Sequence, residues 1–276
     1  AAMLMAVRAI TDLGIDLDGE IVFVACTSGE TGKHDAIRSV VEDAGAMADF
    51  ALICGSSNQV LLGNRGRVDI FLTVHGAPSH SGSPSRGCNA ITGARLVMDR
   101  IQAEAKLPEI HPDLGECTLS FIHVRSFPDA THTVQERCEI TLDRRLLPGE
   151  DPDQVFAEIA AIAKSVEQTP DPVSGQSFRI ECVQGPYMYP YYVAEDSDLV
   201  RRLCDAAERV TGVRPATYYG QSAFDQGYIN HVGIPCANYG PGEDDFAHTD
   251  HDMASVDRTV DATKVYALVA CEHLCE

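Results

Sequence analysis

The element order predicted between residues 68 and 183 constrains this chain more than any other feature. Runs of β-branched and alternating residues are interspersed there with two amphipathic segments of helical period, in the order β-α-β-β-α-β. This order is typical of the split βαβ, or ferredoxin-like, unit. The predicted strands are 68–74, 118–124, 133–142 and 178–183, and the predicted helices are 89–105 and 152–166.

The segments on both sides of this unit predict a second, larger α/β domain. Residues 20–26 predict a buried parallel strand, which a helix at 35–44 and a strand at 50–54 follow. This β-α-β rhythm indicates a parallel sheet covered by helices. After residue 184 the chain continues with elements at 197–210, 235–239 and 256–275. We therefore expect an α/β domain made of residues 1–66 and 185–276, interrupted by a small α+β unit at 67–184.

Composition argues against several classes of protein. The formal net charge of −20 over 276 residues argues against a nucleic-acid partner, because a phosphate backbone requires a basic patch. No apolar run approaches the roughly 18 residues of a membrane span, and the N-terminus lacks the features of a signal peptide. The ten cysteines are scattered without a C-x-x-C pair, which predicts small buried thiols in a reducing, cytoplasmic setting.

A loop rich in Gly, Pro and Ser carries His80. The strand at 68–74 enters this loop, and a helix leaves it near Asn89. A histidine on a stiff loop ahead of a helix is suitably placed to act as a donor over a site. The alternative is a loop histidine without a catalytic role.

Several short motifs follow one another in a fixed order. They are Asp143-Arg-Arg-Leu-Leu-Pro-Gly149, Asp225, Gly233-Ile-Pro235, Tyr239-Gly-Pro-Gly242 and Ala247-His-Thr249. With the His80 loop, they resemble the M20 family of metal-dependent amidohydrolases and exopeptidases. That family includes acetylornithine deacetylase, succinyl-diaminopimelate desuccinylase, aminoacylase and the glutamate carboxypeptidases. The resemblance covers nearly the whole chain.

The resemblance implies an α/β fold with a zinc-peptidase-like parallel or mixed sheet between helical layers. An inserted ferredoxin-like lid, which is also the dimerisation domain, interrupts this catalytic-type domain. The family's H-x-D segment would lie ahead of Ala1, where a helical pattern without a capping residue is already under way. We therefore expect a catalytic domain that lacks its N-terminal strands, and a homodimer formed through the lid.

The resemblance also implies a divalent metal, zinc or else manganese or cobalt, that activates water and polarises a carbonyl. Glu30 and His248 match metal ligands of the family, while Cys54 stands where a ligand glutamate is usual and Gly29 stands where the general-base glutamate is usual. Because a thiolate is a good zinc ligand, Glu30, Cys54 and His248 are candidates for a three-ligand site. The alternatives are a helix-start carboxylate for Glu30, a buried structural thiol for Cys54 and a surface-loop histidine for His248.

Four further residues receive roles from the resemblance. His80 is implied to donate a hydrogen bond to the tetrahedral intermediate. Arg145 is implied to bind a substrate carboxylate through its bidentate fork, with a strand-end salt bridge as the alternative. His132 falls near the asparagine of the family's N-x-x-P, and Asp225 falls at the aspartate of its T-D-A motif; both are substrate-binding candidates.

Two functions remain open on this basis. The first is an M20-type hydrolase of amide bonds in N-acyl amino acids or small peptides. The second is a non-catalytic relative that acts as a dimeric binding or scaffolding protein, because both a base and a ligand position have changed, at Gly29 and Cys54.

Overall fold

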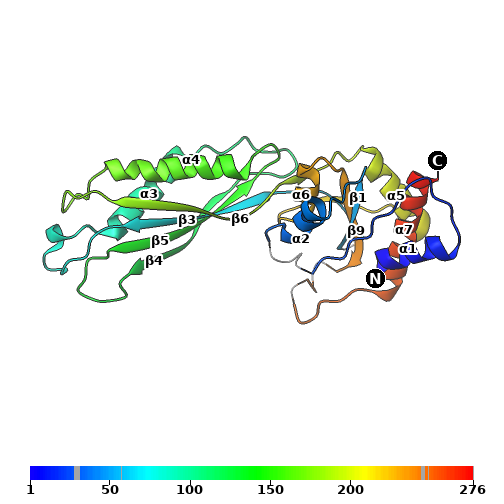
Figure 1. Cartoon of the computed structure of the whole chain (residues 1–276), viewed down its shortest axis with the longest axis horizontal. Helices are drawn as coiled ribbons and strands as arrows, with labels where there is room; N and C mark the ends of the chain where they lie inside the picture. The colour runs from blue at the N-terminus through cyan, green and yellow to red at the C-terminus, as the bar shows by residue number, and fades with distance from the viewer. Residues whose placement is uncertain (28–31, 57, 244–245, 248, 276) are drawn as a thin grey trace. The chain divides into compact units, whose positions relative to one another are not determined.

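The structure is a computed structural model that describes residues 1–27, 32–56, 58–243, 246–247 and 249–275 (Figure 1). The chain divides into two compact units. One, here called the α/β unit, consists of residues 1–64 and 190–276. The other, here called the inserted unit, consists of residues 65–189.

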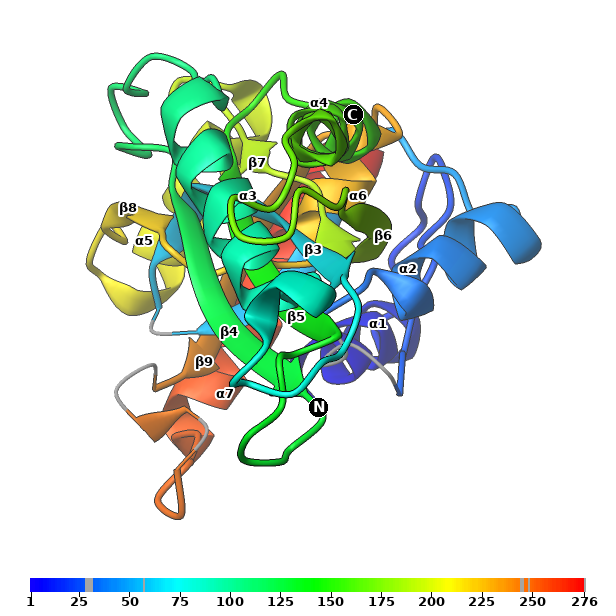
Figure 2. The same ribbon diagram turned by 90° about the vertical axis from the view of Figure 1, so that its left-hand side faces the viewer.

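The inserted unit is an antiparallel sheet with two helices on one face (Figures 1 and 2). Its four strands have the order β4-β5-β3-β6. Together with the helices this is the predicted ferredoxin-like unit, so that prediction is confirmed. The elements are β3 (Gly66–His75), α3 (Ala90–Glu104), β4 (Leu119–Phe127), β5 (Arg137–Leu146), α4 (Pro152–Ser165) and β6 (Arg179–Met188), with 3-10 turns at Pro84–Arg86 and Val166–Gln168.

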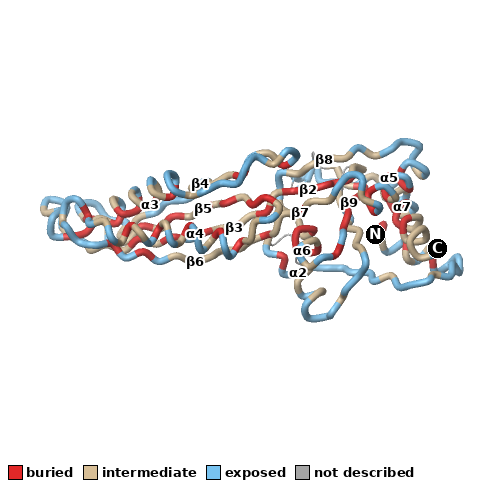
Figure 3. Tube along the Cα trace, turned by 90° about the horizontal axis from the view of Figure 1, so that it is seen from above, coloured by how far each residue is buried: buried red, intermediate tan, exposed pale blue. Residues whose placement is uncertain are grey.

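Alternation along the central strands forms the core of this unit. Every second residue of β3 and β5 is buried beneath α3 and α4, as the red and tan alternation in Figure 3 shows. Leu72, Ile140 and Ile101 are almost fully buried. Burial of each such side chain stabilises the folded state by about 1.5–3 kcal/mol. The helices begin where the sequence predicts, because Asn89 and Asp151 accept hydrogen bonds from the first turns of α3 and α4.

The α/β unit contains a five-stranded mixed sheet with helices on both faces. β1 and β9 run parallel, as do β2 and β8, while β2 is antiparallel to β9 and β7. One apolar cluster packs α1, α5 and α7 on the sheet, and a second packs α6 with support from Ile37 of α2. The elements are α1 (Ala2–Asp12), α2 (Asp35–Arg38), a π-helical turn (Ser39–Asp43), β1 (Ala51–Ser56), β2 (Val60–Asn64), β7 (Tyr191–Tyr192), α5 (Asp198–Thr211), β8 (Thr217–Gly220), α6 (Gln226–His231), β9 (Cys236–Gly242) and α7 (Val256–Leu274).

The prediction of a buried strand at 20–26 is wrong. These residues form no strand, and Val22, Phe23 and Val24 have 52, 43 and 39% of their surface exposed. Apolar, β-branched composition gives a segment strand propensity, but a strand also requires a neighbour to pair with. Within the described residues, β1 pairs with β9 and no strand pairs with 20–26.

Other elements differ from the prediction as well: the strand expected at 133–142 is β5, which runs from Arg137 to Leu146. The strand that was expected to end at 183 continues to Met188, because residues 184–188 pair with the start of β3. The short strand β2 was not predicted, since all five of its residues are buried and it lacks the alternation that marks a half-exposed strand. None of the described helices combines the length and the apolar character that crossing a bilayer requires.

Candidate active site

Backbone hydrogen bonds between two loops fix the position of His80 in the inserted unit. The Ser81 amide donates to the His132 carbonyl at 2.9 Å, and the Val134 amide donates to the Ser79 carbonyl at 2.8 Å. His80 itself forms an isolated antiparallel bridge with Thr133. The His80 loop is therefore attached to the loop that precedes β5.

A close backbone approach explains the glycine at the start of this loop. The amides of Ala77 and Cys88 each donate to the other's carbonyl, at 2.9 and 2.8 Å. A Cβ at Gly76 would lie 2.0 Å from the Cys88 carbonyl oxygen, which no side chain tolerates. Glycine is thus required where β3 leads into the loop.

The His80 ring is exposed, and its surroundings determine which nitrogen carries the proton. The Gly82 amide donates to Nδ1 of His80 at 3.0 Å. An accepting Nδ1 has its lone pair free of a proton, so the neutral ring carries its proton on Nε2. His80 therefore presents an N–H donor away from the loop.

His132 enters the same loop pair with a left-handed backbone. It is exposed and has φ = 62°, and its carbonyl accepts the Ser81 amide. This conformation is uncommon outside glycine and asparagine. The contact from His132 to the His80 loop is therefore made by its main chain.

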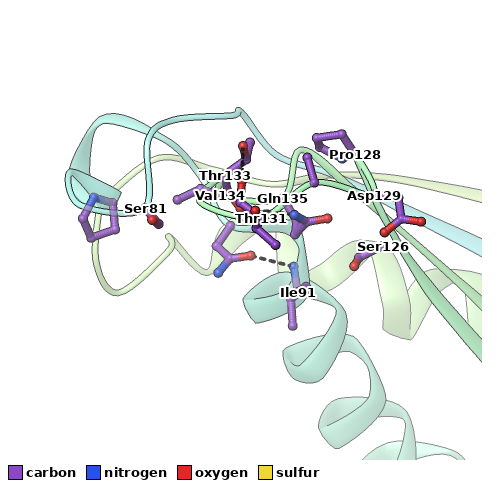
Figure 4. A pocket seen from close by; sticks show the side chains of 12 residues that line it. Ser81, Ile91, Ser126, Pro128, Asp129, Thr131, Thr133, Val134 and Gln135 are labelled. Carbon is purple, nitrogen blue, oxygen red and sulfur yellow. Dashed lines mark hydrogen bonds between the residues drawn. The ribbon is translucent and has the colours of Figure 1, made fainter.

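A groove of about 580 Å³ lies beside these loops (Figure 4). Its walls carry the hydroxyls of Ser81, Ser126, Thr131 and Thr133 and the carboxylate of Asp129. The bond between the Asn89 side chain and the Ile91 amide, dashed in Figure 4, closes one side at the start of α3.

Arg145 lies on the face of the sheet opposite the helices, in an ion-pair grid. Its guanidinium contacts the Asp143 carboxylate at 2.9 and 3.3 Å, and Arg67 and Asp69 form the equivalent pair on β3. Cross-strand register places Asp69 opposite Asp143. Burial raises the pKa of Asp69 and the Asp143 charge adds to this, while Arg67 and Arg145 oppose it. The salt bridge that competes with a substrate-binding role for Arg145 is thus present.

Cys54 lies near the carboxyl end of β1, where β1 and β9 run parallel. The thiol is exposed, so the interpretation of Cys54 as a buried structural residue is wrong. Next to it the backbones approach closely: a Cβ at Gly240 would lie 2.0 Å from the Gly55 carbonyl oxygen. The buried Tyr266 hydroxyl donates to the Tyr239 carbonyl, and burial together with the Cys54 thiol raises the Tyr266 pKa. The carboxyl ends of parallel strands are where α/β proteins place their sites.

Asp225 lies at the start of α6 and contacts His34. Nδ1 of His34 is 3.0 Å from Oδ1 of Asp225, and only 1% of the His34 side chain is exposed. Beside this pair, the Tyr228 hydroxyl donates to Glu42 at 2.7 Å. The hydrogen bond from Tyr228 lowers the pKa of Glu42, and the Arg38 contact lowers it further by a smaller amount. Burial raises the pKa of Tyr228.

The candidate residues divide between the two units. His80, His132 and Arg145 belong to the inserted unit, whereas Cys54 and Asp225 belong to the α/β unit. Glu30, Gly29 and His248 lie outside the described residues. Within the part of the chain that is described, no group of three or more His, Cys, Asp or Glu side chains is arranged to hold a metal ion.

Comparisons with known proteins find one domain model and several distant relatives. Residues 62–169 match the M20 model named Peptidase dimerisation domain. The YgeY protein of Escherichia coli K12 is 25% identical over 98% of this chain and 68% of its own length. A Bacillus subtilis N-formyl-4-amino-5-aminomethyl-2-methylpyrimidine deformylase is 24% identical over 96% of this chain and 67% of its own length.

Solved structures share the fold. Aminopeptidase PepT from Bacillus cereus superposes with a TM-score of 0.72 at 20% identity, over 98% of this chain and 68% of its own. The YXEP protein of Bacillus subtilis, described as a dinuclear metal-binding peptidase of the M20 family, gives 0.70 at 14% identity, over 99% and 70%. The chain thus matches an M20 dimerisation-domain model over residues 62–169 and shares its fold with a solved M20 peptidase. Its inserted unit contains most of the residues that match the dimerisation-domain model.

Two residues of the α/β unit, His34 and Tyr266, make contacts that the sequence does not predict. No local signal shows that His34 contacts a residue 191 positions away. Tyr266 lies in the predicted element at 256–275, and nothing in the local sequence shows that its hydroxyl binds β9 beside Cys54. Both contacts depend on tertiary packing.

Proposed function

We propose that this chain is a metal-dependent hydrolase of amide bonds in N-acyl amino acids or small peptides. The observation that carries this proposal is the His80 geometry: an exposed imidazole on an anchored loop, with Nδ1 occupied by Gly82. Nε2–H is then a donor for the oxygen that becomes negative when a carbonyl is attacked. The names of the relatives support the reaction class, because deformylases and peptidases both cleave amide bonds.

Glu30, Cys54 and His248 would hold the metal. A carboxylate, a thiolate and an imidazole suit zinc best, with manganese or cobalt as alternatives. The exposed Cys54 thiol at the carboxyl end of β1 fits a ligand better than a packing residue. When bound, such an ion lowers the pKa of water and polarises a carbonyl.

The remaining residues bind and orient the substrate in this proposal. Arg145 would exchange Asp143 for a substrate carboxylate of the same geometry. Asp225 would accept a hydrogen bond from the substrate, and His132 would hold the His80 loop through its carbonyl. No residue is assigned as general base, because Gly29 stands where M20 enzymes usually have the general-base glutamate.

We further propose a homodimer formed through the inserted unit, and a cytoplasmic location. β4 lies at one edge of its sheet and exposes Ile122 and Val124, with 59 and 50% of their surface accessible. An exposed apolar edge strand is a template for pairing with a second chain. The ten cysteines are free thiols, which supports a reducing compartment.

Turnover by the metal-loaded chain tests the function. N-formyl, N-acetyl and N-succinyl amino acids and dipeptides form the substrate panel, with zinc, manganese and cobalt each supplied. His80→Ala should lower kcat by about 10²–10³-fold, as expected for one oxyanion donor. His111→Ala is the matched control, because His111 also accepts backbone amides at Nδ1 in a loop of the same unit.

Two outcomes would contradict the proposal. One is equal activity of the His80→Ala and His111→Ala proteins. The other is stoichiometric metal without turnover of any panel member, which would favour a dimeric binding or scaffolding protein.

A further inference from the structure

A buried histidine to which the proposed reaction gives no role, His34, pairs with the partly exposed carboxylate of Asp225 in the α/β unit. His34 and Asp225 are 191 positions apart, yet their side chains meet at 3.0 Å. The His34 side chain is 1% exposed and the Asp225 side chain 23% exposed. One partner is thus enclosed by the protein, while the other reaches the surface.

The chemistry of the pair determines the direction of its hydrogen bond. An ionised carboxylate can only accept, so Nδ1 of His34 carries the proton and donates to Oδ1 of Asp225. A bond with an ionised partner is stronger than one between neutral groups. Among the described residues, no donor contacts Oδ2 of Asp225, so this oxygen keeps its acceptor capacity.

The local backbone is arranged around this contact. His34 has φ = 60°, a left-handed conformation that is strained for histidine, and its carbonyl accepts the Arg38 amide at 2.9 Å. Strain of this kind persists where the surrounding structure holds it, and it concentrates at functional sites. Asp225 occupies the N-cap position of α6 but makes no side-chain cap bond. Its carboxylate is committed to His34 instead.

We propose that His34 is a positioning residue: it fixes Oδ1 of Asp225 so that Oδ2 accepts a hydrogen bond from an N–H or ammonium group of the substrate. This inference rests on the proposed function, because Asp225 contacts the substrate only if the α/β unit binds one. A carboxylate held at one oxygen has one orientation, so it discriminates among donor positions better than a freely rotating one.

Three substitutions separate the roles. Asp225→Ala removes the acceptor without removing a helix cap bond. His34→Asn removes the imidazole, while asparagine tolerates the left-handed backbone. Tyr228→Phe is the control: it breaks the neighbouring bond to Glu42 at 2.7 Å and leaves His34 and Asp225 intact.

Nitrogen-15 NMR of the histidine rings tests the positioning contact without any activity. In the unsubstituted protein and in Tyr228→Phe, Nδ1 of His34 should carry the proton; in Asp225→Ala the proton should shift toward Nε2. Amide exchange at 32–38 and 225–231 should accelerate about tenfold in Asp225→Ala and His34→Asn, as for the loss of one bond to a charged group. An unchanged tautomer, or exchange that rises uniformly across the unit, would overturn the positioning role.

Steady-state kinetics on the best panel substrate tests the substrate contact. KM should rise about tenfold in Asp225→Ala and by a smaller factor in His34→Asn, with kcat within about twofold, because a binding interaction has been lost. Tyr228→Phe should leave KM unchanged. An unchanged KM in both variants, with an active parent protein, overturns the substrate contact alone. An inactive parent protein overturns the proposed function and the substrate contact, and NMR and exchange then decide the positioning contact.

Discussion

The buried ion pair between Arg144 and Glu150 in the inserted unit allows a quantitative test of how burial changes the energetic importance of an ion pair. Nη2 of Arg144 lies 2.6 Å from Oε1 of Glu150, and 3% of the Arg144 side chain is exposed. Oε2 of Glu150 accepts the Leu147 amide at 2.8 Å, which shapes the turn after β5. Nη1 of Arg144 donates to the Arg145 carbonyl and contacts the Cys117 thiol.

Glu150→Ala leaves the Arg144 charge buried without its carboxylate. Removing one partner of a buried pair costs about 3–5 kcal/mol, more than the net contribution of the intact pair, because the remaining charge is desolvated. We therefore expect the free energy of unfolding of the inserted unit to fall by this amount. Denaturant-dependent amide exchange of β3 and β5 measures this unit separately from the α/β unit.

Glu139→Ala is the matched control, because it removes the same charge from the same region. Glu139 pairs with Arg137 at 3.4 Å, but the two side chains are 41 and 43% exposed. Exposed pairs contribute about 0–1 kcal/mol. Equal destabilisation by the two substitutions, or less than about 1 kcal/mol for Glu150→Ala, would refute the reasoning.

Three further predictions follow from particular contacts. Gly76→Ala should displace the His80 loop and lower turnover at least as much as His80→Ala, because its Cβ meets the Cys88 carbonyl at 2.0 Å; unchanged kcat would contradict this. Burial raises the pKa of the Cys117 thiol from 9.0 to about 12, so its contribution to stability is complete below pH 9 and is lost as pH rises toward 12. Between pH 9 and pH 12 the free energy of unfolding should therefore fall less steeply in Cys117→Ala than in the unsubstituted protein. Identical slopes in the two proteins would contradict this prediction. Ile122→Asp on the β4 edge should dissociate the proposed dimer in sedimentation, whereas Val183→Asp on the other edge strand, at 49% exposure, should not.

The inserted unit was largely predictable because local signals there agree with tertiary packing. The period-two alternation of β3 and β5 and the caps at Asn89 and Asp151 all survive in the structure. The pairing of Arg145 with Asp143 could also be predicted, since residues two apart on a strand share a face.

The α/β unit was less predictable because its elements depend on distant partners. Residues 20–26 have the composition of a strand, yet within the described residues they pair with no neighbouring strand. The left-handed backbone of His34 and its contact with Asp225 leave no trace in local sequence. The exposure of Cys54 likewise depends on where β1 ends beside β9, and not on the residues next to it in the chain.

Anomalous diffraction at the zinc edge, from crystals grown with zinc, tests the central claim most directly. The account predicts one strong peak enclosed by Glu30, Cys54 and His248, with a metal–sulfur distance of about 2.3 Å, and its loss in His248→Ala. Zinc-loaded crystals without a peak at those three residues would contradict it.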